Sequence, residues 1–130
     1  MRGVAYAAAV ILEHALLPVR PGEEDAFEAA FAEARLIIAS MRGFRSLSLT
    51  RCIERASTYL LLVEWETIED HTVGFRTSTA YDQWRTLLHH FYEPFPTVEH
   101  FVLPADHERG GGVGAREISG RSSSDWKRSL

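Results

Sequence analysis

The chain has 130 residues, of which 45% are hydrophobic and 25% charged, and this composition is typical of one soluble globular domain. Its formal net charge of −4 provides no basic surface for nucleic acid or for an anionic membrane. No apolar run approaches the ~18 residues that a bilayer-spanning helix needs. A single cysteine, Cys52, excludes an internal disulfide and fits a reducing compartment, so we expect a cytoplasmic protein.

The apolar segment at residues 4–12 is short enough to be a signal peptide. It continues directly into Glu13 and His14, however, without a small-residue cleavage site. We therefore interpret residues 8–17 as a buried first strand, which Pro18 ends.

A helix is expected after Pro21 and Gly22, because three acidic residues follow at the positive end of its macrodipole. Gly43 provides a C-terminal stop. Apolar residues recur between these points at helical spacing and form one stripe, which comprises Phe27, Ala30, Phe31, Ala34, Ile38 and Met41.

Two strands are expected next, at residues 44–54 and 58–66, joined by a short turn at residues 55–57. Alternation in the first of them places Leu47, Leu49 and Ile53 on one face and Ser46, Ser48 and Thr50 on the other. Thr67 and Asp70 have the spacing of a capping box and begin a helical turn, which Gly74 interrupts. The remaining elements are a longer helix, capped by Ser78 or Thr79 and ending at Tyr92, and a fourth strand within residues 97–103.

The order β-α-β-β-α-β predicts an α+β fold of the ferredoxin-like type, in which a four-stranded antiparallel sheet carries both helices on one face. The third strand is nevertheless apolar on both faces: Tyr59, Leu61, Val63 and Trp65 share one, while Leu60 and Leu62 share the other. Helices cover one apolar face only. We therefore expect a second copy of the chain to cover the other face in a homodimer.

Composition changes after Pro104, since residues 105–130 hold five of the nine glycines and five serines, with Trp126 as their one Phe, Trp or Tyr residue. Such a segment buries too little apolar area to offset its ordering entropy. We predict a folded domain at residues 1–104 and a disordered tail at residues 105–130.

Three kinds of side chain are candidates for chemistry. Arg85 falls within the apolar stripe of the second helix, so it either extends past the core edge or projects into a cavity and holds an anion. Trp65 either packs in the core or forms the wall of a pocket for an aromatic ligand. The first and fourth strands are neighbours in this topology, so His14 and His100 could lie close together, and a metal site that combines them with His71 or His89 is an alternative without supporting ligand spacing.

Residues 63–71 (VEWETIEDH), 75–78 (FRTS) and 81–84 (YDQW) together resemble the central signature of the antibiotic biosynthesis monooxygenase family. The helix start at residues 21–22 and the segment at residues 41–44 also match its usual pattern. The resemblance extends over about residues 8–104. It implies a dimeric ferredoxin-like barrel, and oxygenation of polycyclic phenols or quinols without a metal, a flavin or another cofactor.

The resemblance also implies roles for individual residues. Trp65 matches the tryptophan of the quinone-forming branch and Arg85 its arginine, while His71 stands in place of a tyrosine and Leu61 in place of an asparagine. In the heme-degrading branch the triad would fall on His14, Gly74 and Trp84, and none of its residues is retained, so heme degradation is not expected.

The resulting hypothesis is a monooxygenase for a phenolic or quinol-like small molecule. His71 would be the catalytic base, because an unperturbed histidine pKa near 6.5 suits that task, and Arg85 would hold the oxyanion. The residues expected to contact the substrate are Trp65, Trp84, Leu61 and His14. The alternatives are a non-catalytic dimeric module that binds a small ligand and, less favoured, a metal enzyme that uses the histidines.

Overall fold

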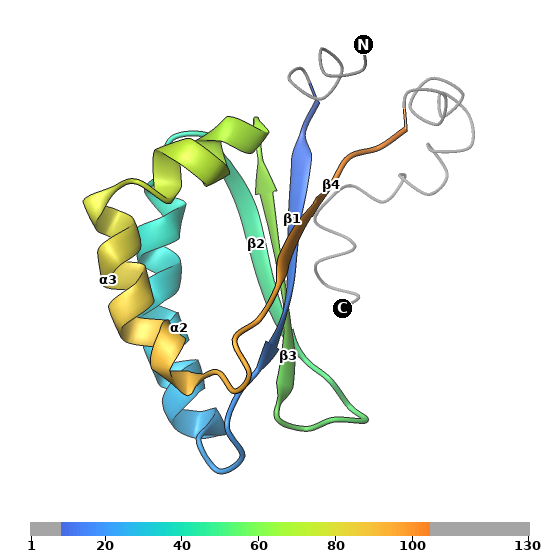
Figure 1. Cartoon of the computed structure of the whole chain (residues 1–130), viewed down its shortest axis with the longest axis vertical. Coiled ribbons are helices and arrows are strands. Elements are labelled where there is room, and N and C mark those ends of the chain that lie inside the picture. The colour runs from blue at the N-terminus through green and yellow to red at the C-terminus, as the bar shows by residue number, and fades with distance from the viewer. Residues whose placement is uncertain (1–8, 105–130) are drawn as a thin grey trace.

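Four strands form one antiparallel sheet in the computed structural model, which describes residues 9–104. They are β1 (Ile11–Pro18), β2 (Phe44–Arg51), β3 (Thr58–Trp65) and β4 (Val98–Phe101), arranged in the order β2-β3-β1-β4. The helical segments are α2 (Glu24–Ala39), the π-helical η1 (Asp70–Phe75), α3 (Thr79–Leu88) and the 3₁₀ turn η2 (His89–Phe91). This is the predicted ferredoxin-like arrangement, with the helices on one side of the sheet (Figure 1).

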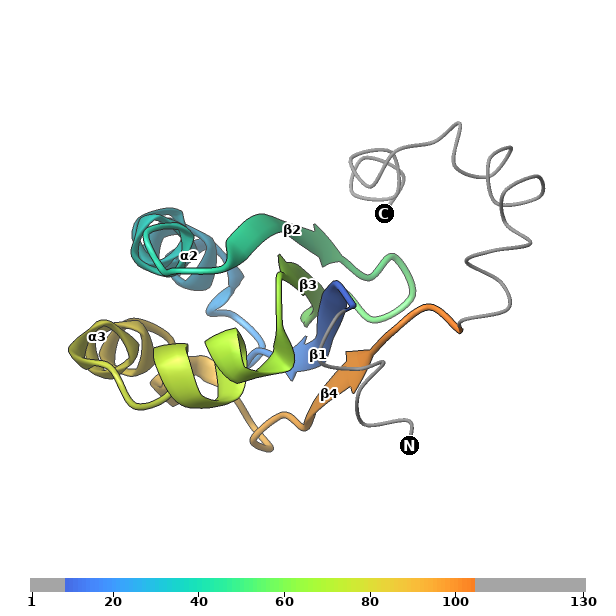
Figure 2. The same cartoon turned by 90° about the horizontal axis from the view of Figure 1, so that it is seen from above.

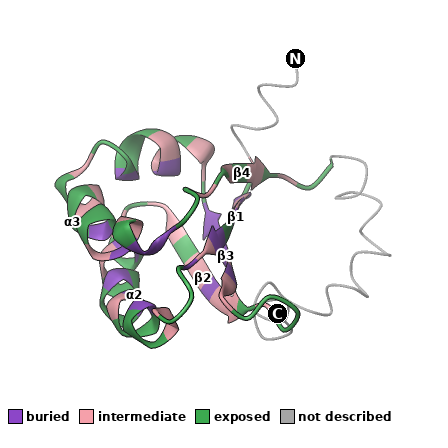
Figure 3. Cartoon of the chain, turned by 60° about the horizontal axis from the view of Figure 1, so that its bottom comes forward, coloured by how far each residue is buried: buried purple, intermediate pink, exposed green. Residues whose placement is uncertain are grey.

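The core lies between the sheet and the two long helices, which run beside each other in one layer (Figure 2). The stripe predicted for α2 is buried at Phe27, Phe31, Ala34 and Ile38. Buried residues also concentrate along the central strands β1 and β3 (Figure 3). Burial of these side chains contributes most of the folding free energy, at roughly 25 cal/mol for each Å² of apolar surface.

Several element ends differ from the sequence prediction. The strand β2 stops at Arg51, because the backbone N–H of Thr58 bonds to the carbonyl of Arg55 at 2.9 Å, instead of to Cys52, and closes the turn earlier. Ile53 consequently lies in the turn with 92% of its surface exposed, and its predicted place in the strand, on the same face as Leu47 and Leu49, was wrong. The last helix ends at Leu88 and tightens into η2, since helix ends often convert to i→i+3 bonds.

The segment η1 follows β3 and carries side chains over the top of the core. Thr67 Oγ1 accepts a hydrogen bond of 3.1 Å from the backbone N–H of Asp70, as the capping pattern predicted. Gly74, which was expected to interrupt this helical turn, lies inside it. Ser78 caps α3 by accepting a hydrogen bond of 3.1 Å from the backbone N–H of Tyr81.

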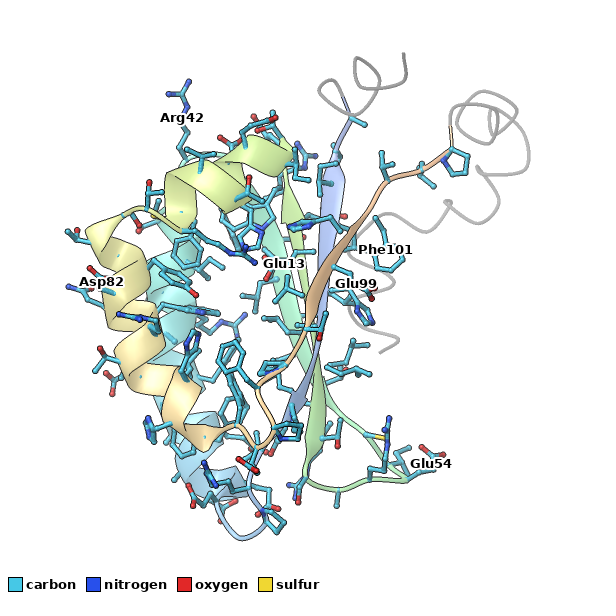
Figure 4. The ribbon with its side chains drawn as sticks, in the orientation of Figure 1. Glu13, Arg42, Glu54, Asp82, Glu99 and Phe101 are labelled. Carbon is cyan, nitrogen blue, oxygen red and sulfur yellow. The ribbon has the colours of Figure 1, made fainter. Side chains whose placement is uncertain are left out.

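The two faces of the sheet differ in what covers them. Alternation along β1 directs Glu13 toward the helices, whereas Glu99 and Phe101 of β4 lie on the opposite side (Figure 4). We call this opposite side the open sheet face; it consists of Leu12, His14, Leu16, Ser46, Ser48, Thr50, Leu60, Leu62, Glu64, Glu99 and Phe101. No helix within residues 9–104 covers it.

The tail predicted for residues 105–130 lies outside the described residues. No helix in the described part of the chain has the length and hydropathy required to cross a membrane.

Candidate functional site

A cavity of about 430 Å³ lies between the helix-facing side of the sheet and the segments η1, α3 and η2. Its apolar wall consists of Ala15, Leu17, Leu61, Phe75, Trp84, Tyr92, Phe95, Pro96 and Val98. Its polar lining consists of Glu13, His71, Arg76, Tyr81 and His89. An apolar wall with four aromatic side chains and a few polar groups is typical of a site for a small organic ligand.

Glu13 reaches this cavity because β1 alternates and because the strand lies at the centre of the sheet. Its cross-strand partners are Val63 of β3 and His100 of β4, and Trp65 lies one pair further along the same face of β3. The indole Nε1 of Trp65 donates a hydrogen bond of 2.9 Å to Glu13 Oε1. A carboxyl group with 4% of its surface exposed is thereby held in place from the neighbouring strand.

His71 approaches the same carboxyl group from η1. Its Nε2 lies 3.4 Å from Glu13 Oε1, and its Nδ1 lies 2.8 Å from Nε2 of His100 in a hydrogen bond whose direction depends on the tautomers. The imidazole also stacks on the Trp65 indole, with 5.4 Å between ring centroids and 18° between planes. Glu13, His71 and His100 therefore form a linear chain from the cavity to the edge strand β4.

Burial determines the protonation states of these three side chains. It raises the pKa of Glu13 to about 7, while the Trp65 hydrogen bond and the charge of Arg76 act in the opposite direction. Burial lowers the pKa of His71 to about 3, and the charges of Arg76 and His100 lower it further. The pKa of His100 is lowered by burial and by Arg76. Both histidines are therefore neutral at pH 7, and the pKa of His71 lies well below the ordinary value on which its prediction as a base rested. The catalytic role of His71 stays a prediction.

Metal binding requires donor atoms that converge on one point. His71 directs Nε2 to Glu13 and Nδ1 to His100, on opposite sides of its ring, so these three side chains do not converge. Residues 9–104 contain no other group of three or more His, Cys, Asp or Glu side chains arranged to hold a metal ion.

Most of the residues predicted for the site lie in or behind the cavity. Leu61, His71 and Trp84 line it. Trp65 is fully buried and lies behind the polar end, where it contacts Glu13 and His71 rather than the cavity itself.

Two predicted residues lie elsewhere. Arg85 follows Trp84 by one helical position, a rotation of about 100° that takes it off the cavity-facing side of α3. Its side chain is 56% exposed, and its Nη2 lies 3.9 Å from Asp82 Oδ1. His14 lies on the open sheet face, because it alternates with Glu13, and its partner on β4 is Glu99 rather than His100.

The sequence prediction missed Glu13 and Arg76. A lone carboxylate within the apolar residues 8–17 was a usable signal, because such a side chain is rarely buried without a partner. Arg76 lies directly after η1 and lines the cavity, so it supplies the positive charge that was expected from Arg85. Only the path of η1 over the sheet brings it there.

Comparison with known proteins places the chain and its fold in a family. The Bacillus subtilis protein YczJ, which is uncharacterized, is 54% identical over 92 residues that cover 71% of this chain and 97% of YczJ. A Bordetella bronchiseptica protein classed as an antibiotic biosynthesis monooxygenase is 38% identical, with a TM-score of 0.71 and coverage of 74% of this chain and 98% of its own. SnoaB of Streptomyces nogalater, described as a cofactor-independent oxygenase, is 20% identical, with a TM-score of 0.58 and coverage of 75% and 93%, and this likeness shows the fold alone. The family model of antibiotic biosynthesis monooxygenase matches residues 10–89, so the chain belongs to that family.

Proposed function

We propose that the cavity binds a phenolic or quinol-like aromatic molecule and oxidises it with O₂ without a bound cofactor. The observation that carries this proposal is the joint presence of Glu13 and Arg76 in an aromatic-lined cavity of about 430 Å³. A carboxylate that removes a proton and a guanidinium that holds the resulting oxyanion are the groups that such chemistry requires from the protein.

The proposed reaction balances with O₂ as the only oxidant. A phenol with a free para position and one O₂ give a quinone and one water, so that each product receives one oxygen atom. Deprotonation makes the ring electron-rich enough to pass an electron to O₂. The cavity wall, with Phe75, Trp84 and Tyr92, would exclude water from the anion and strengthen its contact with Arg76.

The names of related proteins support the same chemistry. The Bordetella bronchiseptica relative is classed as a monooxygenase, and SnoaB is described as a cofactor-independent oxygenase. Membership in the same family makes oxygenation the first activity to test.

Oxygen consumption by metal-stripped protein tests the proposal, with a panel of anthrones, naphthols and quinols as substrates. We expect uptake with at least one compound, and a fall of about 10²-fold or more in Arg76→Ala, because a hydrogen bond to a developing charge is removed. Arg85→Ala is the matched control, since this arginine lies outside the cavity, and it should retain activity. Loss of activity in Arg85→Ala but not in Arg76→Ala would restore the role first predicted for Arg85.

Binding without turnover is the second candidate function, and Leu61 favours it. This residue lines the cavity and offers no polar contact to a substrate or to oxygen. Tight binding of panel members without any oxygen uptake would identify the protein as a ligand-binding module.

We further propose that the protein acts as a homodimer through the open sheet face. Leu16 and Phe101 on this face remain 42% and 49% exposed. On the same face, His14 Nδ1 and Ser48 Oγ are buried and have no hydrogen-bond partner within residues 9–104. Exposed apolar side chains on a sheet face that no helix of residues 9–104 covers favour a second protein surface, and the dimeric fold that the family resemblance implies makes a second copy the proposed partner.

A further inference from the structure

We propose that Glu13 accepts the proton of the bound substrate and that His71 passes it to His100, at the edge of the sheet. This inference rests on the proposed function, because it assigns the acid–base roles within the same cavity. It differs from the sequence prediction, in which His71 itself was the base.

Geometry makes Glu13 the acceptor. Trp65 Nε1 and His71 Nε2 both approach Glu13 Oε1, at 2.9 Å and 3.4 Å, which leaves Oε2 as the oxygen available to a ligand. The carboxyl group lines the cavity, and the charge of Arg76 stabilises its ionised form. Burial holds the pKa of Glu13 at about 7, which suits a group that must both take up and release a proton near neutral pH.

His71 has the contacts of a relay. It is 3% exposed, and each of its two ring nitrogens faces a different proton-carrying side chain. Burial and Arg76 lower the pKa of His71 to about 3, so it does not hold a second proton at neutral pH. A neutral imidazole can still receive a proton at Nε2 while it releases another from Nδ1.

The transfer conserves every proton. Glu13 takes the proton at Oε2, and a half-turn of the carboxyl group about the Cγ–Cδ bond brings this proton to His71 Nε2. As Nε2 receives it, His71 Nδ1–H donates to His100 Nε2, and His100 then releases the proton on its Nδ1 to solvent. The 2.8 Å contact between the two imidazoles already has hydrogen-bond length. The 3.4 Å contact between Glu13 and His71 requires a shift of about half an ångström to reach it.

His100 is the exit, because β4 is an edge strand and this side chain is only half-buried. The other polar groups that face Glu13, His71 and His100 do not offer a further path for the proton. Trp65 on β3 only donates a hydrogen bond, Arg76 after η1 stays charged, and Tyr81 and His89 line the cavity along α3 and at its end. The chain through His71 is therefore the proposed path for the proton.

The role of Glu13 is tested without turnover by binding 2-naphthol, a phenol that is neutral in solution at pH 8 and whose neutral and ionised forms have different absorbance bands. Titration calorimetry in buffers of different protonation enthalpy gives the protons released when it binds at pH 8. We expect the wild type to bind the ionised form without net proton release, and Glu13→Gln to release one proton for each phenolate bound. Equal proton release in the two proteins, or a bound probe that stays neutral in both, would overturn the assignment.

The relay is tested by a pH jump on the same complex, followed by the absorbance of the bound probe. His100→Gln retains a side chain that can bond to His71 Nδ1 but cannot pass a proton. We expect it to slow the protonation of the probe by about tenfold or more, with an unchanged end point and with recovery on addition of imidazole. His90→Gln is the control, since His90 is exposed and does not line the cavity.

An unchanged rate in His100→Gln, or a slower rate that imidazole does not restore, would overturn the relay. Neither experiment depends on oxygen. A protein that passes both tests but consumes no O₂ would disprove the proposed oxygenation and leave the acid–base assignment standing.

Discussion

Trp65 and Glu13 lie on neighbouring strands, and the indole Nε1 of Trp65 donates a hydrogen bond of 2.9 Å to Glu13 Oε1. The tryptophan is fully buried, and it also carries His71 stacked on its ring. It therefore holds Glu13 and His71 in place without lining the cavity itself. This indirect position leads to a prediction that separates electrostatic from packing effects.

Trp65→Phe should raise the pKa of Glu13 above about 7, because the indole hydrogen bond stabilises the ionised carboxylate in the wild type and is absent from the variant. The unpaired carboxyl group should also cost about 1–3 kcal/mol of stability. A ¹³C NMR titration of the Glu13 carboxyl carbon would measure the pKa. Trp84→Phe is the control, since Trp84 lines the same cavity without a bond to Glu13; an equal pKa change in both variants would argue against a specific effect of the hydrogen bond.

Glu13→Gln should change how stability depends on pH. The folded-state pKa of about 7 lies above the ordinary value of 4.5, so the folded protein binds more protons than the unfolded chain between these values. The contribution of Glu13 to the free energy of unfolding is therefore largest below pH 4.5 and decreases as the pH rises toward 7. Relative to wild type, Glu13→Gln should gain up to about 3 kcal/mol across this range.

Urea unfolding of both proteins at several pH values would measure this difference. His71 has the opposite effect, because its lowered pKa makes the free energy of unfolding fall as the pH drops from 6.5 toward 3. The wild-type profile is therefore flatter than that of Glu13→Gln. The exposed Glu66→Gln serves as the control, and a pH-independent difference between Glu13→Gln and wild type would contradict a raised pKa of Glu13.

Gly43→Ala should disturb the site from a distance. Gly43 has φ +83°, and a Cβ at this position would collide with the side chain of Asp70, the first residue of η1. Gly22 has φ +92° but no neighbouring atom within 4 Å of such a Cβ, so Gly22→Ala meets backbone strain alone. We expect Gly22→Ala to cost about 1–2 kcal/mol and Gly43→Ala about 1–3 kcal/mol more.

Thermal unfolding of the two glycine variants, together with the affinity for a phenolic ligand, would check this prediction. Only Gly43→Ala should weaken binding, because η1 carries His71 and leads into Arg76. Equal binding in both variants would show that η1 tolerates displacement at Asp70.

Leu16→Glu should convert the proposed dimer into monomers, because it places a charge in the middle of an apolar contact on the open sheet face. Light scattering coupled to size-exclusion chromatography gives the mass of each species. Leu36→Glu on α2 is the matched control, since Leu36 is 71% exposed and lies on a helix rather than on this face. A wild type that is monomeric at micromolar concentration would disprove the dimer.

Local patterns were sufficient to predict the order of elements and the faces that they bury. The spacing of Phe27, Phe31 and Ile38 identified the inner face of α2, and the alternation of Tyr59, Leu61, Val63 and Trp65 identified the inner face of β3. These predictions succeeded because side-chain direction in helices and strands follows a fixed period. Ends of elements were predicted less well, as Ile53 shows, because a turn closes where its hydrogen bonds form.

The site was predicted only in part. Sequence identified Trp65, His71, Leu61 and Trp84, which lie in or behind the cavity, but it assigned the cationic role to Arg85. The identity of the arginine that lines the cavity depends on where η1 crosses the sheet, and no local pattern contains that information. The same crossing places His71 between Glu13 and His100, which are far apart in the chain.

The sequence by itself determined the ferredoxin-like fold, the buried faces and the family, because each follows from periodicity or from a contiguous motif. Tertiary structure alone decided that Glu13 is buried beside Trp65 and that His71 is neutral. The pKa of a side chain depends on the solvent that its neighbours exclude and on the charges that they bring near. Those neighbours come from β1, β3, η1 and β4, and only the folded chain assembles them.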